Sequence, residues 1–319
     1  MQGVLLDFDT LTFDNDVDVS RMQDLPGMAW RFHGATLPDQ VAARIDGCDV
    51  VVVNKVVLNR DILEGAAGIL KLIVIAATGT NNVDLEAAQR LGMTVCNVRG
   101  YGTASVVQHV YTLILALTTQ LPRYVQAVRD GRWQRNPQFC ILDYPIRELN
   151  GLNLGIVGYG TLGRGVAEVA PAFGLTALLA QRPGGAPQPD RLQMEELLPQ
   201  VDILSLHCPL TDQTRNLIGR AELQVMKKDA ILINTARGGI VNEPELVDAL
   251  KAGEIGGAGF DVLTEEPPVN GNVLLDADLP NLIVTPHTAW ASRQARQRVI
   301  DIVADNIAAF LDESPVNVV

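Results

Sequence analysis

Short apolar runs alternate with amphipathic stretches along almost the whole chain, which has 319 residues. Several runs are β-branched and apolar at successive positions, as expected for strands buried on both faces of a parallel sheet. The first series predicts strands at 4–8, 50–53, 72–75 and 94–96, and helices at 37–44, 61–68 and 85–91. Alternation of this kind predicts a doubly wound α/β domain.

A second series of the same kind follows. It predicts strands at 154–157, 177–180, 203–206, 230–234, 258–261 and 283–285, and helices at 162–173, 220–226 and 243–252. Longer helical patterns at 104–119 and 292–311 flank this series. No strand follows the second of them, so it could pack back on the first domain and leave the second domain inserted there. Residues 129–148 are rich in Pro, Arg and aromatics without a clear period, which predicts an ordered arm or loop.

The length and charge of the chain indicate a two-domain globular protein and disfavour nucleic-acid binding. A chain of this length exceeds one compact core of usual size, so two domains are expected. The hydrophobic fraction of 47% and the charged fraction of 19% are typical of a globular enzyme. The formal net charge of −12 makes nucleic-acid binding unfavourable, because the chain gains nothing from counterion release on a polyphosphate. An anionic substrate would need a local cation to hold it.

The cysteines and the start of the chain indicate the compartment. The four cysteines form no C-x-x-C pair and most lie in or beside apolar runs, so we expect small buried thiols and neither a disulfide nor a metal site. The first eight residues turn acidic at Asp7 and lack the basic start of a signal peptide. The apolar stretch 110–121 is shorter than the ~20 residues of a membrane-spanning helix. The sequence therefore predicts a cytoplasmic protein without a membrane segment.

A glycine-rich turn directly follows the predicted strand at 154–157 and opens the next helix. It reads Gly158-Tyr-Gly160-Thr-Leu-Gly163. Gly158 would permit a tight turn, Gly160 would let the backbone approach a pyrophosphate, and Gly163 would let helix and strand pack closely. The helix N-terminus would offer unpaired N–H groups to the phosphates. The turn indicates a dinucleotide cofactor, and the alternative is a glycine turn in an α/β fold without a ligand.

The end of the second strand in this domain bears on the choice between NAD and NADP. An acidic residue usually stands there and binds the ribose 2′-hydroxyl. This chain instead has Gln181 and Arg182 and no acid. The missing acid removes repulsion of a 2′-phosphate and Arg182 offers a guanidinium partner, so NADP is slightly favoured and NAD is not excluded. Alternatively, Arg182 is a solvated loop residue and both cofactors are used.

Three charged side chains stand shortly after the last three predicted strands. They are Arg237, Glu266 and His287. Ligands of open α/β sheets bind at the carboxyl ends of the strands. Taken singly, the three have ordinary explanations as a helix-capping cation, a surface charge and a loop histidine. Together, beside a dinucleotide fingerprint, they indicate a site for an anionic carbonyl compound.

Longer motifs surround these residues. They are Ala77-Thr-Gly79-Thr-Asn-Asn-Val-Asp84, His207-Cys-Pro-Leu-Thr211, Asn234-Thr-Ala-Arg237-Gly, Glu266-Pro-Pro and Pro286-His287-Thr-Ala-Trp290. With the glycine fingerprint, they make the chain resemble the D-isomer-specific 2-hydroxyacid dehydrogenases from about Val50 onward. The segment after Glu266 and the pairing of His287 with Trp290 are most similar to the glycerate dehydrogenase or hydroxypyruvate reductase branch. The first 49 residues contribute little to the resemblance.

The resemblance implies a division of the chain and an assembly. A Rossmann dinucleotide-binding domain, residues 101–285, would be inserted into a flavodoxin-like substrate domain, residues 1–100 and 286–319. The protein would be a homodimer built on the cofactor domain.

The resemblance also implies site roles. Arg237 would grip the substrate carboxylate and keto oxygen, and His287 would be the general acid/base, paired with Glu266 rather than Glu265. Substrate contacts are implied for Thr78, Gly79 and Trp290. Cofactor contacts are implied for Thr103, Gly158, Gly160, Thr161, Leu162, Gly163, Gln181, Arg182, Cys208, Pro209, Thr235, Ala236 and Asp261, the last at the nicotinamide carboxamide. The chain departs from the family before His109, where Gln108 replaces a frequent Glu.

The implied activity is hydride transfer between NADP or NAD and a small anionic 2-keto acid or D-2-hydroxy acid. Hydroxypyruvate and glyoxylate are the leading substrates by resemblance. Histidine is the side chain suited to exchanging the proton at neutral pH, and arginine can bind a carboxylate with two parallel hydrogen bonds. Two alternatives stay open: oxidation of formate or phosphite on the same scaffold, and a non-catalytic, dinucleotide-sensing protein of the co-repressor kind.

Overall fold

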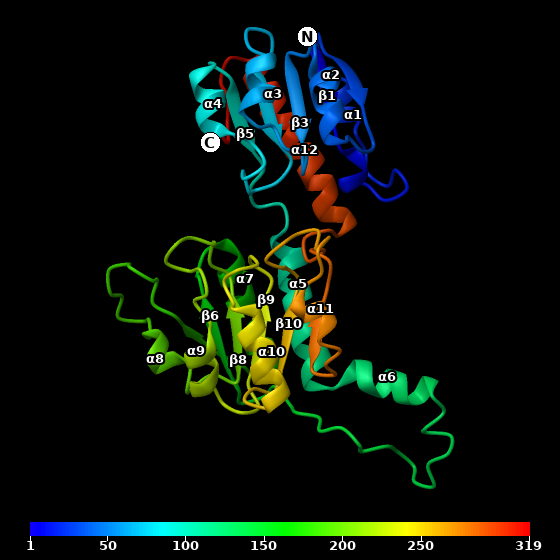
Figure 1. Cartoon of the computed structure of the whole chain (residues 1–319), viewed down its shortest axis with the longest axis vertical. Coiled ribbons are helices and arrows are strands. Elements are labelled where there is room, and N and C mark those ends of the chain that lie inside the picture. Colours follow the sequence, from blue (N-terminus) through cyan, green and yellow to red (C-terminus); the bar gives the residue numbers. More distant parts are fainter. The chain divides into compact units, whose positions relative to one another are not determined.

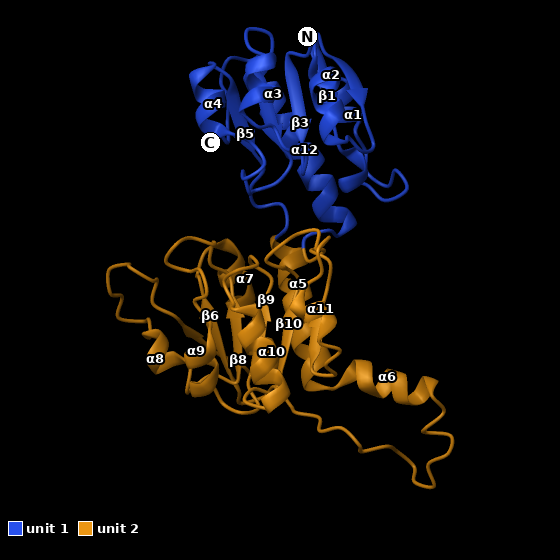
Figure 2. Ribbon diagram, viewed as in Figure 1, with its two compact units in different colours: residues 1–102, 290–319 blue, residues 103–289 orange.

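The computed structural model describes all 319 residues, which form two compact units (Figure 2). Unit 1 comprises Met1–Gly102 and Trp290–Val319, and unit 2 comprises Thr103–Ala289. Each unit holds one sheet in which every strand pair is parallel. Helices lie on the faces of each sheet (Figure 1).

The sheet of unit 1 has the strand order β2-β1-β3-β4-β5, which is the flavodoxin order. Its strands are β1 (Gln2–Leu5), β2 (Ala29–Phe32), β3 (Val50–Val53), β4 (Leu72–Ile75) and β5 (Thr94–Asn97). Every residue of β3 and β4 is buried, which explains why both stand out as apolar runs. β2 lies at the edge of the sheet and is partly exposed, so the sequence carries no apolar run there and the strand was not predicted.

Helices of unit 1 come from both of its chain segments. They are α1 (Ser20–Gln23), α2 (Val41–Ile45), α3 (Arg60–Gly65), α4 (Leu85–Arg90) and α12 (Arg293–Leu311), with 3-10 turns η1 (Phe8–Thr10) and η2 (Pro38–Gln40). The long helix α12 packs on one face of the sheet. Its residues Val299, Val303 and Ile307 belong to the same hydrophobic core as Leu5 and Val52. The last predicted helix therefore packs on the first series of strands.

The sheet of unit 2 has the order β11-β10-β9-β8-β6-β7. Its strands are β6 (Asn153–Val157), β7 (Thr176–Leu179), β8 (Ile203–Leu206), β9 (Ile231–Asn234), β10 (Gly257–Phe260) and β11 (Leu282–Val284). An isolated parallel bridge between Ala180 and Leu192 follows β7. If this bridge is taken as a minimal strand, the order from it to β10 is the Rossmann order 3-2-1-4-5-6. The predicted fold class, two doubly wound parallel-sheet domains, is confirmed.

The helices of unit 2 include three that the sequence analysis did not predict: α6, α8 and α11. The set is α5 (Thr103–Thr118), α6 (Leu121–Arg129), α7 (Thr161–Val169), α8 (Met194–Leu197), α9 (Arg220–Val225), α10 (Glu243–Ala252) and α11 (Val273–Asp276), with a 3-10 turn η3 (Ala170–Phe173). Two of the missed helices have only four residues, too few for a helical period to emerge in the sequence. No helix in the structure combines the length and the apolar run needed to cross a membrane.

Residues 130–148, called the arm below, follow α6 and contain no helix or strand. Figure 1 shows α6 and the arm extending away from the sheet of unit 2. The arm is anchored to α6 by Tyr144, whose ring makes an edge contact with Tyr124 at 5.0 Å between centroids. The guanidinium of Arg123 lies 3.8 Å from the centre of the same ring. The expected arm without regular structure is therefore present and has local contacts that order it.

Candidate active site

The strand register of unit 2 gathers the motifs at one edge of its sheet. Val157 pairs with Leu206, Leu206 with Asn234, Asn234 with Phe260, and Phe260 with Val284. The loops that follow these residues therefore leave the same carboxyl edge. This is the edge at which open α/β sheets bind ligands.

The glycine fingerprint adopts the turn its sequence predicts. Gly158 has a φ of 93°, and a Cβ on it would lie 2.6 Å from the backbone nitrogen of Cys208. A Cβ on Gly163 would lie 2.0 Å from the carbonyl oxygen of Gly158. Both positions therefore require glycine for packing within the protein. Gly160 differs, because a Cβ there would meet no atom within 4 Å.

The residues around Gly160 fit a dinucleotide phosphate. Gly160 caps this nine-residue helix, α7, without a side chain, so no capping side chain binds the first-turn N–H groups and the space beside Gly160 is open. At the carboxyl end of β9, which β8 separates from β6, the hydroxyl oxygen of Thr235 is buried and has no hydrogen-bond partner. An unpaired buried hydroxyl and an open helix N-terminus at one sheet edge are features that a bound cofactor would satisfy. The other expected cofactor residues of this edge are Thr161, Leu162, Cys208, Pro209 and Ala236, with Thr103 at the start of α5.

Gln181, at the end of β7, has a different environment from the one the sequence predicts. Its side chain is buried, and its Nε2 donates to the carbonyl oxygens of Gly185 and Ala186 at 3.3 and 2.7 Å. Its Oε1 accepts from the backbone N–H of Gln188 at 3.2 Å. Both amide hydrogens are therefore used within the loop. Gln181 shapes this loop and is not available as a hydrogen-bond donor to a ribose.

Two arginines lie at the same end of β7. Arg182 is exposed and its side chain makes no ion pair or hydrogen bond, while its backbone carbonyl accepts from the N–H of Gly185 at 2.9 Å. The guanidinium of Arg191 stacks 4.5 Å from the ring centre of Tyr159, the residue between the first two fingerprint glycines. The Nε atom of Arg191 is buried without a hydrogen bond. The sequence analysis did not single out Arg191. This residue directly precedes Leu192, which the structure pairs with Ala180 at the end of β7.

Arg237 stands on a turn fixed by Asn234, the last residue of β9. The buried Asn234 side chain accepts from the N–H of Ala236 at 3.1 Å and donates to the carbonyl oxygen of Arg237 at 3.0 Å. The Arg237 side chain is exposed and makes one hydrogen bond, to the neighbouring carbonyl oxygen of Ala236 at 2.7 Å. Most of its donors are therefore free to bind an anion.

Glu266 and His287 form a hydrogen-bonded pair. Nδ1 of His287 lies 2.7 Å from Oε2 of Glu266, and each side chain is 32% exposed. Burial alone would raise the pKa of Glu266, but hydrogen bonds from His287 and the Leu263 amide, with the charges of His287 and Arg237, outweigh it and lower the pKa. Glu265 instead accepts from Asn270 at 2.9 Å. The glutamate next to the proline is therefore the one that faces the histidine.

His287 sits in a strained backbone conformation. Its φ is 54°, a left-handed value that costs a non-glycine residue about 1–3 kcal/mol. Asp261, which is 1% exposed, holds the loop in place. Its Oδ1 accepts from the N–H of Thr288 at 2.9 Å, and its Oδ2 accepts from the N–H of Ala289 at 2.7 Å. The carboxylate expected at a nicotinamide is thus also the anchor of the histidine loop.

The three expected substrate residues outside this set lie in unit 1. Thr78 follows β4, and its hydroxyl donates to the carbonyl oxygen of Val98 at 2.8 Å, which orders the turn that includes Gly79. Trp290 makes an edge contact with Tyr101, with 5.9 Å between ring centroids. The sequence did not predict this partner for Trp290.

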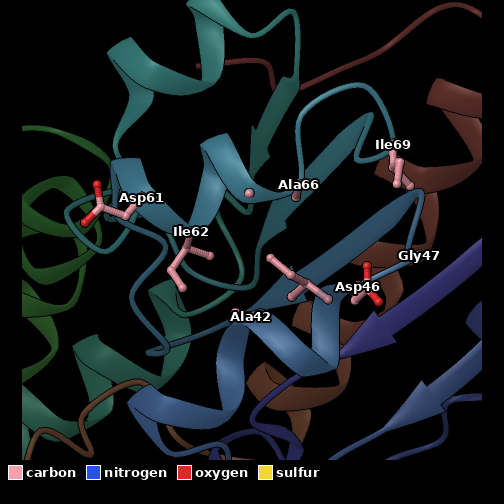
Figure 3. Close-up of a pocket in the computed structure, with 9 residues that line it drawn as sticks. Ala42, Asp46, Gly47, Asp61, Ile62, Ala66 and Ile69 are labelled. Atoms are coloured by element: carbon pink, nitrogen blue, oxygen red, sulfur yellow. The ribbon is translucent and has the colours of Figure 1, made fainter.

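A pocket in unit 1 is lined by none of these residues. It lies between α2 and α3 and encloses about 80 Å³ (Figure 3). Its walls are mostly Ala, Ile and Gly, and its only charged side chains are the carboxylates of Asp46 and Asp61. A pocket with two carboxylates and no cation disfavours an anionic substrate. No group of three His, Cys, Asp or Glu side chains in the structure has a metal-binding arrangement.

Comparison with known proteins connects this geometry to a family. A family model for the NAD binding domain of D-isomer specific 2-hydroxyacid dehydrogenases matches residues 111–289. The chain is 48% identical to a glycerate dehydrogenase of Methylorubrum extorquens over 282 residues, 88% of each chain. It is 38% identical to a hydroxypyruvate reductase of Blautia hydrogenotrophica over 285 residues, also 88% of each. The crystal structure of the TT0316 protein of Thermus thermophilus superimposes over both whole chains with a TM-score of 0.87 and 33% identity.

Proposed function

Because the chain belongs to the D-isomer specific 2-hydroxyacid dehydrogenase family, we propose that it reduces hydroxypyruvate or glyoxylate, with His287 as proton donor. The resemblance drawn from the sequence motifs is thereby confirmed. The protein is an oxidoreductase that transfers a hydride between NAD(P)H and a 2-keto acid. The observation that carries the proposal is the 2.7 Å contact between His287 and Glu266 at the carboxyl edge of the sheet.

In this proposal, three side chains of unit 2 have different roles in the reduction. The nicotinamide cofactor, when bound, supplies the hydride. The keto oxygen needs a proton, and Nε2 of His287 is the ring nitrogen free to give it, because Nδ1 faces Glu266. The Glu266 carboxylate stabilises the imidazolium before transfer. Arg237 binds the substrate carboxylate with two parallel hydrogen bonds and polarises the carbonyl.

Unit 1 supplies the remaining substrate contacts in this proposal. The backbone N–H groups near Thr78 and Gly79 bind the substrate carboxylate, and Trp290 bounds the space for the substrate side chain. Unit 2 then serves as the dinucleotide-binding domain and unit 1 as the substrate domain. The ordered turn at Thr78 supports this, because a hydroxyl bonded to Val98 holds the following amides in place.

The choice of substrate is tested by initial rates with a panel of 2-keto acids and with formate and phosphite. We expect the highest kcat/KM for hydroxypyruvate or glyoxylate, since two relatives are named for glycerate and hydroxypyruvate chemistry. Turnover of formate or phosphite alone would replace the proposal with oxidation on the same scaffold. Tight cofactor binding without turnover of any compound would support a dinucleotide-sensing role.

We further propose that NADP is preferred over NAD. No acid stands at the end of β7, and the exposed Arg182 can pair with a 2′-phosphate. Arg191 adds a second guanidinium next to the fingerprint through its stacking on Tyr159, with the carboxylate of Asp190 3.7 Å from its Nε. A well-formed charged hydrogen bond contributes about 1.5–3 kcal/mol, reduced by exposure, so we expect a preference of about tenfold.

Direct binding tests the cofactor preference without turnover. The dissociation constants of NADPH and NADH are measured by fluorescence titration for wild type, Arg182→Ala and Arg191→Ala. Each variant should weaken NADPH several-fold and leave NADH nearly unchanged. Arg220→Ala is a matched control, because Arg220 pairs with Asp248 on an exposed surface. Tighter binding of NADH than of NADPH by the wild type would overturn the proposal.

A homodimer built through unit 2 is also proposed. The arm exposes Phe139 and Leu142, with 94% and 80% of their surfaces accessible. The apolar residues Leu121, Val125 and Val128 on α6 are exposed as well. Apolar side chains clustered on a projecting segment are typical of a surface covered by a second subunit. Sedimentation of wild type and a Phe139→Ser, Leu142→Ser double variant tests this, and a monomeric wild type would refute it.

A cytoplasmic location is proposed from the cysteines. Cys48, Cys96 and Cys208 are buried and unpaired, and Cys140 is exposed and free. Burial raises the pKa of Cys96 and of Cys208 to about 11, so both remain protonated thiols. Free thiols of this kind are typical of a reducing compartment. Fractionation of cells that express the protein tests the location.

A further inference from the structure

A second histidine is connected to the His287 loop. His109 lies on α5, and its Nε2 is 3.0 Å from the hydroxyl oxygen of Thr285, a residue 176 positions further along the chain. The same hydroxyl lies 2.5 Å from Oδ1 of Asp261. Asp261 in turn holds the backbone N–H groups on the far side of His287. The chain of contacts therefore runs from α5 to the strained histidine.

The donor and the acceptor of each hydrogen bond in this series of contacts follow from the number of hydrogens available. The Thr285 hydroxyl has one hydrogen, and its shortest acceptor is the Asp261 carboxylate, since the carbonyl of Phe260 lies at 3.3 Å. Its oxygen can then only accept from His109, so Nε2 of His109 carries the donated hydrogen. His109 also lies 3.7 Å from Oδ1 of Asp261, and its side chain is 19% exposed.

The three acceptor contacts of Asp261 come from the residues on either side of His287. Two are backbone N–H groups and one is the Thr285 hydroxyl. A carboxylate offers about four lone-pair sites, so little capacity is left for other partners. If the Thr285 hydroxyl turned away, the carboxylate would lose one anchor and the left-handed conformation at His287 would lose part of its support.

We propose that His109 is a positioning residue for the reaction: it orients Thr285, and through Thr285 and Asp261 it fixes the backbone that aims His287. The inference rests on the proposed function of His287 as proton donor. His109 touches neither Glu266 nor His287 in the structure, so its effect is exerted through the loop. The glutamine that precedes it, Gln108, is exposed and has no part in the chain of contacts.

Two substitutions at His109 separate positioning from structure. His109→Leu removes the donor, whereas His109→Gln keeps a neutral N–H at a similar reach. We expect His109→Leu to lower kcat about tenfold or more, with the NADPH dissociation constant and Tm nearly unchanged. His109→Gln should recover most of kcat. Gln108→Ala is the matched control on the same helix and should behave as wild type.

A double-mutant cycle with Thr285→Val tests the proposed route. If His109 acts through the hydroxyl, the double variant His109→Leu, Thr285→Val should lose no more activity than the worse single variant. Multiplied losses would refute the route, and a normal kcat in His109→Leu would refute the role. If either the leucine or the valine variant unfolds, His109→Asn decides: its shorter amide cannot reach the Thr285 hydroxyl, so kcat should fall while Tm stays at the wild-type value, and a normal kcat would refute the role.

A spectroscopic readout keeps this inference separate from the proposed function. The chain has four histidines, so the ring resonances of His287 can be assigned in NMR spectra by single substitutions. The His287 signals should shift in His109→Leu and return in His109→Gln. A wild type that turns over no keto acid but shows these shifts would refute the function and leave the positioning intact. Unchanged His287 signals in an active enzyme would refute the positioning alone.

Discussion

Gly238 and Leu263 touch backbone to backbone: a Cβ on Gly238 would lie 1.9 Å from the carbonyl oxygen of Leu263. The N–H of Leu263 donates to Oε1 of Glu266 at 2.7 Å. The turn that carries Arg237 is therefore set against the loop that carries Glu266. The charge of Arg237 contributes to the lowered pKa of Glu266. The close contact of Gly238 with Leu263 therefore helps to set the pKa of this carboxylate.

Replacement of His287 by alanine should lower kcat for keto-acid reduction by at least ~10²-fold, the usual scale for losing a general acid. The dissociation constant of NADPH should change little. Single-turnover kinetics and fluorescence titration measure the two effects. A near-normal kcat would remove His287 from the reaction.

Arg237→Lys should fail although it keeps the positive charge. A lysine ammonium cannot form the planar pair of hydrogen bonds that a guanidinium makes with a carboxylate. We expect kcat/KM for hydroxypyruvate to fall more than tenfold, which corresponds to at least ~1.4 kcal/mol. A loss below about threefold would place the substrate carboxylate elsewhere.

Glu266→Gln should change the pH dependence of reduction. Because the pKa of Glu266 is lowered, the carboxylate is charged throughout the neutral range and favours the protonated imidazole. An amide gives no such support, so the limb on which kcat/KM falls with rising pH should move to lower pH. Glu265→Gln is the control, since Glu265 contacts Asn270. An unmoved limb in Glu266→Gln would make Glu266 a bystander.

Gly160→Ala should weaken the cofactor without harming the fold. The added Cβ meets no protein atom within 4 Å, but it would occupy the space that a pyrophosphate needs. We expect the NADPH dissociation constant to rise at least about tenfold while Tm stays close to wild type. Gly65→Ala in α3, also free of contacts, is the control and should leave cofactor binding unchanged. Equal NADPH affinity in Gly160→Ala would move the phosphate site.

Asp202→Asn should destabilise the protein at neutral pH and less so in acid. Burial raises the pKa of Asp202, but hydrogen bonds from Asn153, Lys227 and Arg147 outweigh it and lower the pKa. A lowered folded pKa contributes stability above the unfolded value of ~3.9, which is lost as the pH falls through the folded pKa. Urea unfolding should therefore show a deficit of about 2 kcal/mol at pH 7 that shrinks toward pH 3. A deficit that stays constant with pH would contradict the assignment.

The sequence predicted the buried strands well and the edge of unit 1 poorly, for a physical reason. Strands such as β3 are covered on both faces, so every residue is apolar and the strand appears in the sequence as a continuous apolar run. The edge strand β2 is covered less and carries no such run. The short apolar stripe of α6 was likewise too brief to separate a helix from the arm that follows it.

The candidate site residues are those that a sequence motif marks, whereas contacts made only in the folded chain could not be predicted. Arg237, Glu266 and His287 stand at strand ends, which the pattern of runs locates. The bonds from Gln181 to the carbonyls of its own loop leave no trace in hydrophobic patterning. Nor does the contact of His109 with Thr285, because the two are joined only by the folded sheet.

The position of α12 has a consequence for folding during synthesis. Unit 2 is one continuous segment, whereas one face of the unit 1 sheet is covered by a helix that leaves the ribosome after all of unit 2. We therefore expect unit 2 to fold on the ribosome first, while the strands of unit 1 stay open to chaperones until α12 emerges. Proteolysis of chains stalled on the ribosome at residue 319, in which α12 is still inside the exit tunnel, should leave a protected unit 2 and a digested N-terminal segment. Protection of residues 1–102 in such chains would contradict this order.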